Sequence, residues 1–248
     1  MNTWRPSVGR QSRLSRRTLI AAGAGALGLA NAAGTSLAQP HGPPEGGATP
    51  DEALARLMAG NARFVADKNK HPDLGTERRL ALATGQHPFA TLLDCADSRV
   101  APELIFDQGL GDLFTVRVAG NVVDDAVLGS IEYSVIHLGA PLVMVLGHQR
   151  CGAVTAALEA AEGRSSPEDR DTKIGDLVAR IAPAVSAIPK DAPDRLDAVI
   201  LENARLAATN LLKSSAPIRE RMIAKRLRVV SARYSLDDGK VTQVLDAA

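Results

Sequence analysis

The sequence predicts an α/β fold with a mainly parallel sheet, an added antiparallel edge strand, flanking helices and an N-terminal helical arm. The first observation is that short apolar runs, typical of buried strands, alternate with amphipathic helical stretches. The second is Asp238-Gly239, a hairpin turn that joins the last two predicted strands and makes the final one antiparallel. A chain of 248 residues fits one large domain with additions.

The first helix is predicted from its capping residues. Thr49 stands at the cap, Pro50 in the first turn, and Glu52 three residues after the cap, which is a capping box. Apolar residues at helical spacing extend the helix to about Asp67. The sequence leaves open whether this helix packs on its own core or on a neighbouring subunit.

The remaining elements follow from periodicity and from the glycines and prolines that interrupt it. Further helices are predicted at 76–84, 102–106, 124–138, 151–161, 174–188, 194–212 and 218–226. Strands are predicted at 90–93, 112–118, 141–146, 227–234 and 241–245. The polar stretch 163–171 is predicted to be a loop.

Composition excludes several classes of function. The chain is 45% apolar and 23% charged, with a net charge of +1, which is an ordinary globular composition. Neither this charge nor an aromatic content of 3% suits a nucleic-acid-binding protein.

The first 38 residues have the pattern of a twin-arginine export signal. Arg16-Arg17 precedes the Gly- and Ala-rich run 21–30, and a small-x-small cleavage site ends at Ala38. We expect a signal peptide at 1–38, a flexible linker at 39–48, and one domain at 49–248, exported to the periplasm or beyond. The mature chain would then have 24 basic and 28 acidic residues and no stable membrane association. An uncleaved anchor or a disordered tail is the alternative.

Two short motifs carry the chemistry. Cys95, Asp97 and Arg99 follow the first strand at alternate positions, and His148 and Cys151 follow the third. In a parallel sheet the carboxyl ends of strands meet at one edge, where ligands bind. Two thiolates and one imidazole are a zinc set, and three protein ligands are typical of catalytic zinc. We expect one Zn²⁺ per chain, held by Cys95, His148 and Cys151, beside an Asp97–Arg99 ion pair.

Two other interpretations of the cysteines stay open. In an oxidising compartment two cysteines usually form a disulfide, and a reactive thiol is a further option. The histidine three residues before Cys151 favours the metal, because a disulfide does not require it.

Cys95-x-Asp97-Ser98-Arg99 together with His148-x-x-Cys151-Gly152 resembles the paired motifs of the β-class carbonic anhydrases. The resemblance implies a zinc enzyme that hydrates carbon dioxide to bicarbonate and a proton, with Asp97 and Arg99 as catalytic residues. It also implies homodimers or larger homo-oligomers with active sites at the subunit interface.

Further positions match the plant-like subgroup of that family. The resemblance implies that Gln86, Phe114 and Tyr133 line the substrate pocket. The other subgroup has a tryptophan where this chain has Leu92, and an arginine of its bicarbonate pocket falls at Arg117. Asp94 departs from the family, in which a smaller residue is commoner.

The ligand residues do not fix the substrate. Carbon disulfide or carbonyl sulfide would suit the same fold and metal, and a zinc-binding or disulfide-stapled module without activity is a third hypothesis. Asp97 and Arg99 count against that module, because a structural site requires neither.

Overall fold

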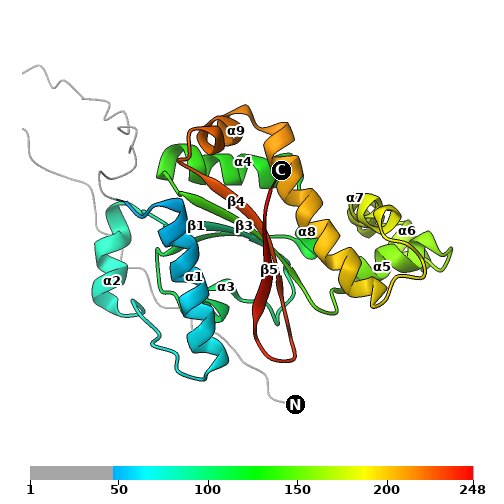
Figure 1. Ribbon diagram of the computed structural model, residues 1–248, viewed down its shortest axis with the longest axis horizontal. Coiled ribbons are helices and arrows are strands. Elements are labelled where there is room, and N and C mark those ends of the chain that lie inside the picture. Colours follow the sequence, from blue (N-terminus) through cyan, green and yellow to red (C-terminus); the bar gives the residue numbers. More distant parts are fainter. Residues whose placement is uncertain (1–46, 248) are drawn as a thin grey trace, which may run out of the picture. The chain divides into compact units, whose positions relative to one another are not determined.

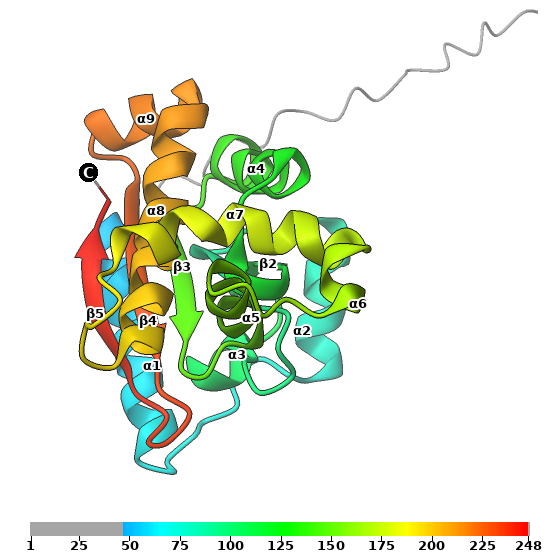
Figure 2. The ribbon, with the colours of Figure 1, turned by 90° about the vertical axis from the view of Figure 1, so that its right-hand side faces the viewer.

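The computed structural model describes residues 47–247, which form a five-stranded sheet covered by helices (Figure 1). The strand order is β2-β1-β3-β4-β5. Strands β1, β2, β3 and β4 are parallel, and β5 runs antiparallel to β4 at one edge (Figure 2). The strands are β1 (Ala90–Asp94), β2 (Leu113–Arg117), β3 (Leu142–His148), β4 (Arg228–Tyr234) and β5 (Val241–Asp246). This confirms the predicted fold class.

The central strands are apolar because both faces of the sheet are covered. All residues of β1 and β3 are buried. Strand β2 differs from the prediction of a buried strand, since only Leu113 is fully buried in it. It lies at the open edge of the sheet, where one side has no neighbouring strand within the described residues.

Helix α1 (Pro50–Val65) covers one face of the sheet together with the short helix α3 (Pro102–Ile105). The predicted capping box is present at Thr49 and Glu52. The helix packs on its own chain, with Leu57 fully buried, and a Cβ at Gly60 would overlap the carbonyl of Phe106. Close approach of the two segments therefore requires glycine at this position.

The other face is covered by α4 (Asp125–Tyr133), α8 (Arg195–Ser214) and α9 (Ala216–Ile223). The stretch predicted as one helix at 124–138 continues beyond α4 as a π-helical turn, Ser134–Leu138, and ends at Gly139 in the left-handed conformation. Its buried Ser134 hydroxyl lies 2.7 Å from that of Thr91 in β1.

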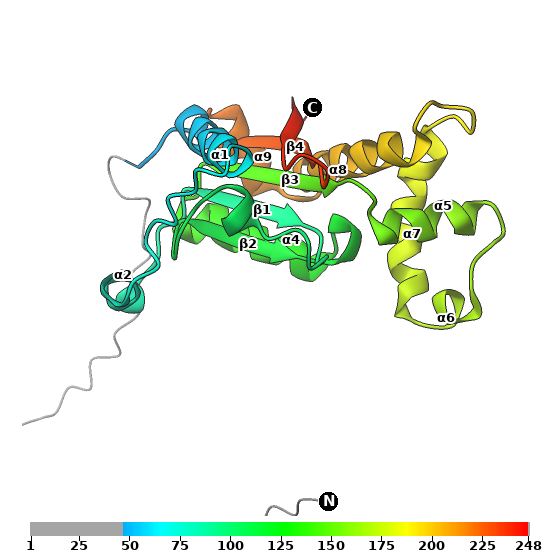
Figure 3. The ribbon, with the colours of Figure 1, turned by 90° about the horizontal axis from the view of Figure 1, so that it is seen from below.

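Three helices lie beyond the carboxyl ends of β1 and β3 (Figure 3). They are α5 (Gly152–Ala161), α6 (Pro167–Arg170) and α7 (Lys173–Ala187). Helix α6 falls in the stretch predicted as a loop, and its cap is Ser166, whose hydroxyl accepts a hydrogen bond from the amide of Asp169. One turn of helix is too short to show apolar periodicity in the sequence.

The short helix α2 (Thr76–Ala81) and a 3₁₀ turn, Leu82–Thr84, precede β1, as the prediction for 76–84 required. The predicted signal peptide at 1–38 and most of the linker at 39–48 lie outside the described residues. No helix in the range 47–247 is long and apolar enough to cross a bilayer.

Candidate metal centre

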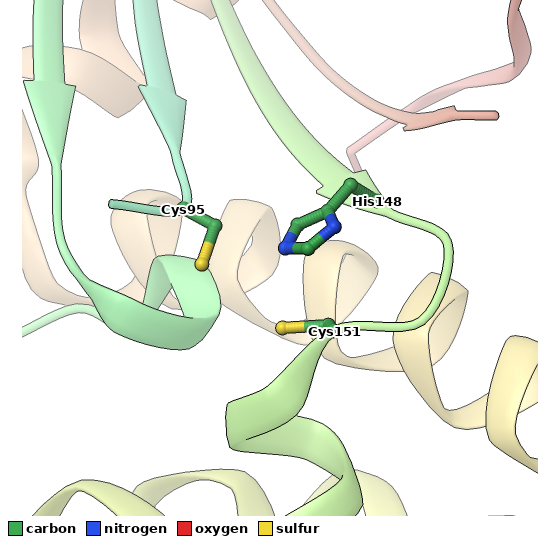
Figure 4. A group of neighbouring side chains, drawn as sticks. All are labelled: Cys95, His148 and Cys151. Carbon is green, nitrogen blue, oxygen red and sulfur yellow. The ribbon is translucent and has the colours of Figure 1, made fainter. Parts of the chain in front are cut away.

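The carboxyl ends of β1 and β3 bring the two predicted motifs together. These strands pair in parallel, with Asp94 opposite Leu146, so Cys95 emerges beside the end of β3. His148 is the last residue of β3, and Cys151 is the cap of α5. The three side chains converge on one point between the two strand ends (Figure 4).

The donor atoms of this cluster suit a tetrahedral metal. The thiol sulfurs of Cys95 and Cys151 and a ring nitrogen of His148 lie within 4.8 Å of one another, and all three residues are buried. His148 Nε2 is buried without a hydrogen-bond partner, whereas Nδ1 lies 3.0 Å from the carbonyl oxygen of Gln149. An orphaned buried nitrogen beside two thiols is the arrangement that zinc completes. Both cysteines are free, so the disulfide interpretation is wrong for this structure.

Contact between the two thiols shifts their pKa values in opposite directions. The pKa of Cys95 is lowered to about 4, chiefly because the Cys151 thiol donates a hydrogen bond to it. His148 and the backbone amide of Gly120 lower it further, and burial acts in the opposite direction. The same contact and burial raise the pKa of Cys151. Such a pair holds one proton between two sulfurs, and a divalent cation bound there favours the thiolate form of both.

Asp97 is turned toward Arg99. Arg99 Nε and Nη2 lie 2.9 and 2.7 Å from the two carboxylate oxygens, and the Arg99 amide donates to Oδ1 at 2.9 Å. These bonds outweigh burial and hold the pKa of Asp97 well below its usual range. Asp97 Oδ2 lies 3.8 Å from His148 Nε2. The structure therefore places an ionised carboxylate at the edge of the metal centre.

Asp94, the unusual neighbour of Cys95, is paired with Arg117. Its side chain is 0% exposed, and Oδ2 lies 3.1 Å from Arg117 Nε. Burial raises the pKa of Asp94 to about 8, against the opposing effect of the Arg117 charge. The parallel register places these two residues opposite each other at the ends of β1 and β2.

Arg117 also fixes the segment that carries Cys95 and Asp97. Its Nε and Nη2 lie 3.2 and 3.1 Å from the carbonyl oxygen of Cys95, and Nη2 lies 2.7 Å from that of Asp97. In the sequence, Arg117 matches only an arginine of the other subgroup's bicarbonate pocket, and no local pattern predicts this positioning role. The signal was its place at the end of a strand that pairs with β1.

Two further residues support Cys95 and were not singled out from the sequence. Gly120, in the left-handed conformation, directs its amide to the Cys95 sulfur at 3.3 Å. Asn203 of α8 donates to the carbonyl oxygen of Gly120 at 2.8 Å. Neither has a local sequence signal, because both contacts join segments far apart in the chain.

The three predicted pocket residues lie away from the metal centre of their own chain. Phe114 pairs with Thr91, four residues before Cys95, which is roughly 13 Å along a strand. The rings of Phe114 and Tyr133 are 6.3 Å apart, and Tyr133 is 49% exposed. Gln86 and Tyr133 line a separate cavity with His87 and Leu138. The structure thus gathers these three residues at the opposite end of β1 from Cys95.

Comparison with known proteins decides the family. The profile of the family described as carbonic anhydrase matches residues 90–241. The chain belongs to the β-class carbonic anhydrases. It is 46% identical to carbonic anhydrase 2 of Mycobacterium tuberculosis, over 77% of this chain and 91% of that protein. It is 43% identical to the carbonic anhydrase of Mycolicibacterium smegmatis, over 77% of this chain and 92% of that protein.

Solved β-carbonic anhydrases share the fold. The structure of CcaA matches with a TM-score of 0.57 at 24% identity, over 76% of this chain and 93% of the other. A tetrameric enzyme of Sordaria macrospora matches with a TM-score of 0.58 at 24% identity, over 79% and 97%. Zinc is the cofactor of this family, and the Cys95, His148 and Cys151 cluster has the donors to hold it.

Proposed function

We propose that this protein catalyses the reversible hydration of carbon dioxide to bicarbonate and a proton, with Cys95, His148 and Cys151 holding zinc. The observation that carries the proposal is the ion pair of Asp97 and Arg99 set directly beside the three metal donors. A zinc ion with three protein ligands activates water near neutral pH and leaves a position for substrate. A structural site would require neither Asp97 nor Arg99.

The protein's own residues would orient the reacting water. Arg99 engages both oxygens of Asp97, so the carboxylate stays ionised and its lone pairs are fixed in direction. Asp97 Oδ2, at the edge of the metal centre, would accept a hydrogen bond from the water that attacks carbon dioxide. Arg117 and Gly120 would keep the Cys95 segment in place during turnover.

We assign the chain to the plant-like subgroup on the same geometry. That assignment requires Asp97 to pair with Arg99 instead of binding the metal, and the observed pairing supports it. Leu92 in place of tryptophan and the residues Gln86, Phe114 and Tyr133 support it from the sequence.

The decisive test combines metal analysis with stopped-flow carbon dioxide hydration. We expect about one zinc per chain in the wild type. Arg99→Ala should retain zinc and lose at least tenfold in kcat, because Asp97 loses the partner that directs it. Lys190→Ala, which removes an exposed cation outside the Asp97–Arg99 pair, is the control. Wild-type turnover in Arg99→Ala would show that the Asp97–Arg99 pair has no catalytic role. Activity on carbon disulfide but not on carbon dioxide would show that the proposed substrate is wrong.

We also propose that two copies of the chain complete each active site. The support is the separation of Gln86, Phe114 and Tyr133 from the metal centre of their own chain, together with the exposure of Tyr133. A dimer that places this end of one copy against the metal end of another would unite them. One structural neighbour is described as tetrameric.

Export through the twin-arginine pathway is a separate proposal. It is supported by Arg16-Arg17, the apolar run 21–30 and the site at Ala38. Changing both arginines to lysine should retain the precursor in the cytoplasm, as measured by fractionation. Unchanged amounts of periplasmic enzyme would exclude this route.

A further inference from the structure

The stretch from Lys213 to Arg228 is strongly basic on a chain of nearly neutral charge. It contains six cations and a single carboxylate, Glu220, whereas the whole chain has a net charge of +1. Three of the cations line one cavity of about 380 Å³: Arg221 of α9, and Lys225 and Arg226 just after it. Positive charge is therefore concentrated at one hollow in the surface.

This cavity lies at the amino-terminal ends of the strands, away from the metal centre. Its other walls are residues 47–50 at the start of α1, 87–89 before β1, and Leu138, Gly139 and Pro141 before β3. Strands β1 and β3 are five and seven residues long, so they separate the cavity from the metal centre by roughly 17–23 Å.

The three cations lack a salt-bridge partner within the described residues. None of them forms a salt bridge there, whereas Arg228, two positions after Arg226, pairs with both Asp51 and Asp246. Glu52, near the cavity wall, is engaged by Thr49 at the cap of α1. Burial, and then the charge of Arg226, lower the pKa of Arg221.

The carboxyl-terminal ends of nearby helices offset only part of this positive charge. Arg221 Nη2 lies 3.4 Å from the carbonyl oxygen of Ile136 in the π-helical turn, and the carboxyl end of α9 is close to Lys225 in sequence. A helix end carries about half an elementary charge, which is too little to offset three cations. The amino-terminal end of the 16-residue helix α1 at this cavity adds positive potential.

We propose that this cavity binds a phosphate group. Arg221 and Arg226 offer planar forks of donors that match phosphate oxygens, and Lys225 adds a third charge. Apolar walls at Phe89, Leu138 and Pro141 leave room for an organic group attached to the phosphate. The phosphate is supplied either by a free ion or ester in solution, or by the headgroup of an anionic lipid. The proposal does not depend on the catalytic one.

The test is calorimetric titration of full-length, zinc-loaded protein with inorganic phosphate at low ionic strength. We expect one saturable site that Arg221→Gln and Arg226→Gln each weaken about tenfold, as expected for the loss of one charge-assisted contact. Lys213→Gln is the matched control. It removes one charge from the same basic stretch but lies outside the cavity, and it should change affinity less than twofold.

A second arm distinguishes the two sources of phosphate. Sedimentation with phosphatidylglycerol vesicles, compared with phosphatidylcholine vesicles, tests a lipid headgroup. Binding to phosphatidylglycerol vesicles that is lost in Arg221→Gln/Arg226→Gln supports a lipid headgroup. Binding of inorganic phosphate without binding to these vesicles supports a soluble ligand. Arg226→Gln should not lower the melting temperature, because it removes the charge that repels Arg221.

Three results would overturn the proposal. They are the absence of saturable binding to both phosphate and anionic vesicles, an equal loss in Lys213→Gln, and phosphate binding that persists in the double variant. The last result would show that phosphate binds outside this cavity.

Discussion

At the scale of single residues, Arg117 links the buried side chain of Asp94 to the backbone that carries the metal ligand Cys95. One guanidinium pairs with a fully buried carboxylate and donates to the carbonyl oxygens of Cys95 and Asp97. The unusual Asp94 is therefore matched by a structural partner on the next strand.

We predict that Arg117→Met will lower both stability and zinc retention. The substitution leaves Asp94 buried without a partner. We expect a loss of about 1–3 kcal/mol in unfolding free energy, less than for a fully buried pair, because solvent screens the one-third of Arg117 that is exposed. Urea unfolding of the zinc protein measures the first effect, and zinc release to a chelator measures the second. The double variant Asp94→Asn/Arg117→Met should recover stability but still release zinc faster than the wild type. Wild-type release in both variants would show that Arg117 does not position the ligands.

At the scale of elements, helix α1 is joined to the loops beneath it by polar groups as well as by apolar packing. Asp107, whose side chain is 0% exposed, accepts from Arg63 of α1 at 2.5 Å and from the backbone amides of Lys70 and His71. Asn61 of the same helix accepts from the amide of Val241 and donates to the carbonyl oxygens of Gly239 and Ile105. These bonds fix the helix against α3 and the final hairpin.

Stability should depend on pH through Asp107. Burial alone would raise its pKa, but the bonds from Arg63, Lys70 and His71 outweigh burial and lower the pKa below its ordinary value. A lowered pKa in the folded state stabilises the protein above the unfolded-state pKa of about 3.9, and this contribution is lost as pH falls through the folded-state value. We expect the difference in unfolding free energy between wild type and Asp107→Asn to be constant from pH 5 to 7 and to shrink below pH 4.

The control for this measurement is Asp67→Asn. Asp67 is exposed and forms no salt bridge within residues 47–247, so its substitution should change the unfolding free energy by less than about 0.5 kcal/mol. A difference for Asp107→Asn that does not vary with pH would show that the lost contacts, and not the ionisation of Asp107, cause the destabilisation.

At the scale of the whole molecule, the two ends of the parallel sheet carry different chemistry. The carboxyl ends hold Cys95, His148 and Cys151 with the Asp97–Arg99 pair. The amino-terminal side holds the basic cavity and, beside it, Gln86 and Tyr133. His87 lines both of these cavities. Gln86 and Tyr133 therefore lie away from the metal centre of their own chain, and the proposed dimer would bring them to the centre of another copy.

Mixed oligomers test that arrangement. Cys151→Ser should abolish zinc binding, and Gln86→Ala should reduce activity while keeping the metal. A dimer formed from one copy of each variant contains one site with intact ligands from the Gln86→Ala copy and an intact Gln86 from the other. Co-expression should therefore yield more activity than the sum of the separate variants. Activity equal to that sum would show that each chain uses its own residues.

The fold class, the order of the elements and the metal donors could be predicted from the sequence. These depend on local information: apolar periodicity marks strands and helices, Thr49 and Glu52 mark a helix start, and His148 and Cys151 flank one strand-to-helix turn. The residues that hold those donors in place depend on tertiary packing and could not be predicted. The register of β1 against β2 sets Arg117 opposite Asp94, and the packing of α8 brings Asn203 to Gly120. Such contacts join residues 23 and 83 positions apart, and no local pattern encodes them. The same register places Phe114 beside Thr91, four residues before Cys95, and so away from the metal centre of its own chain.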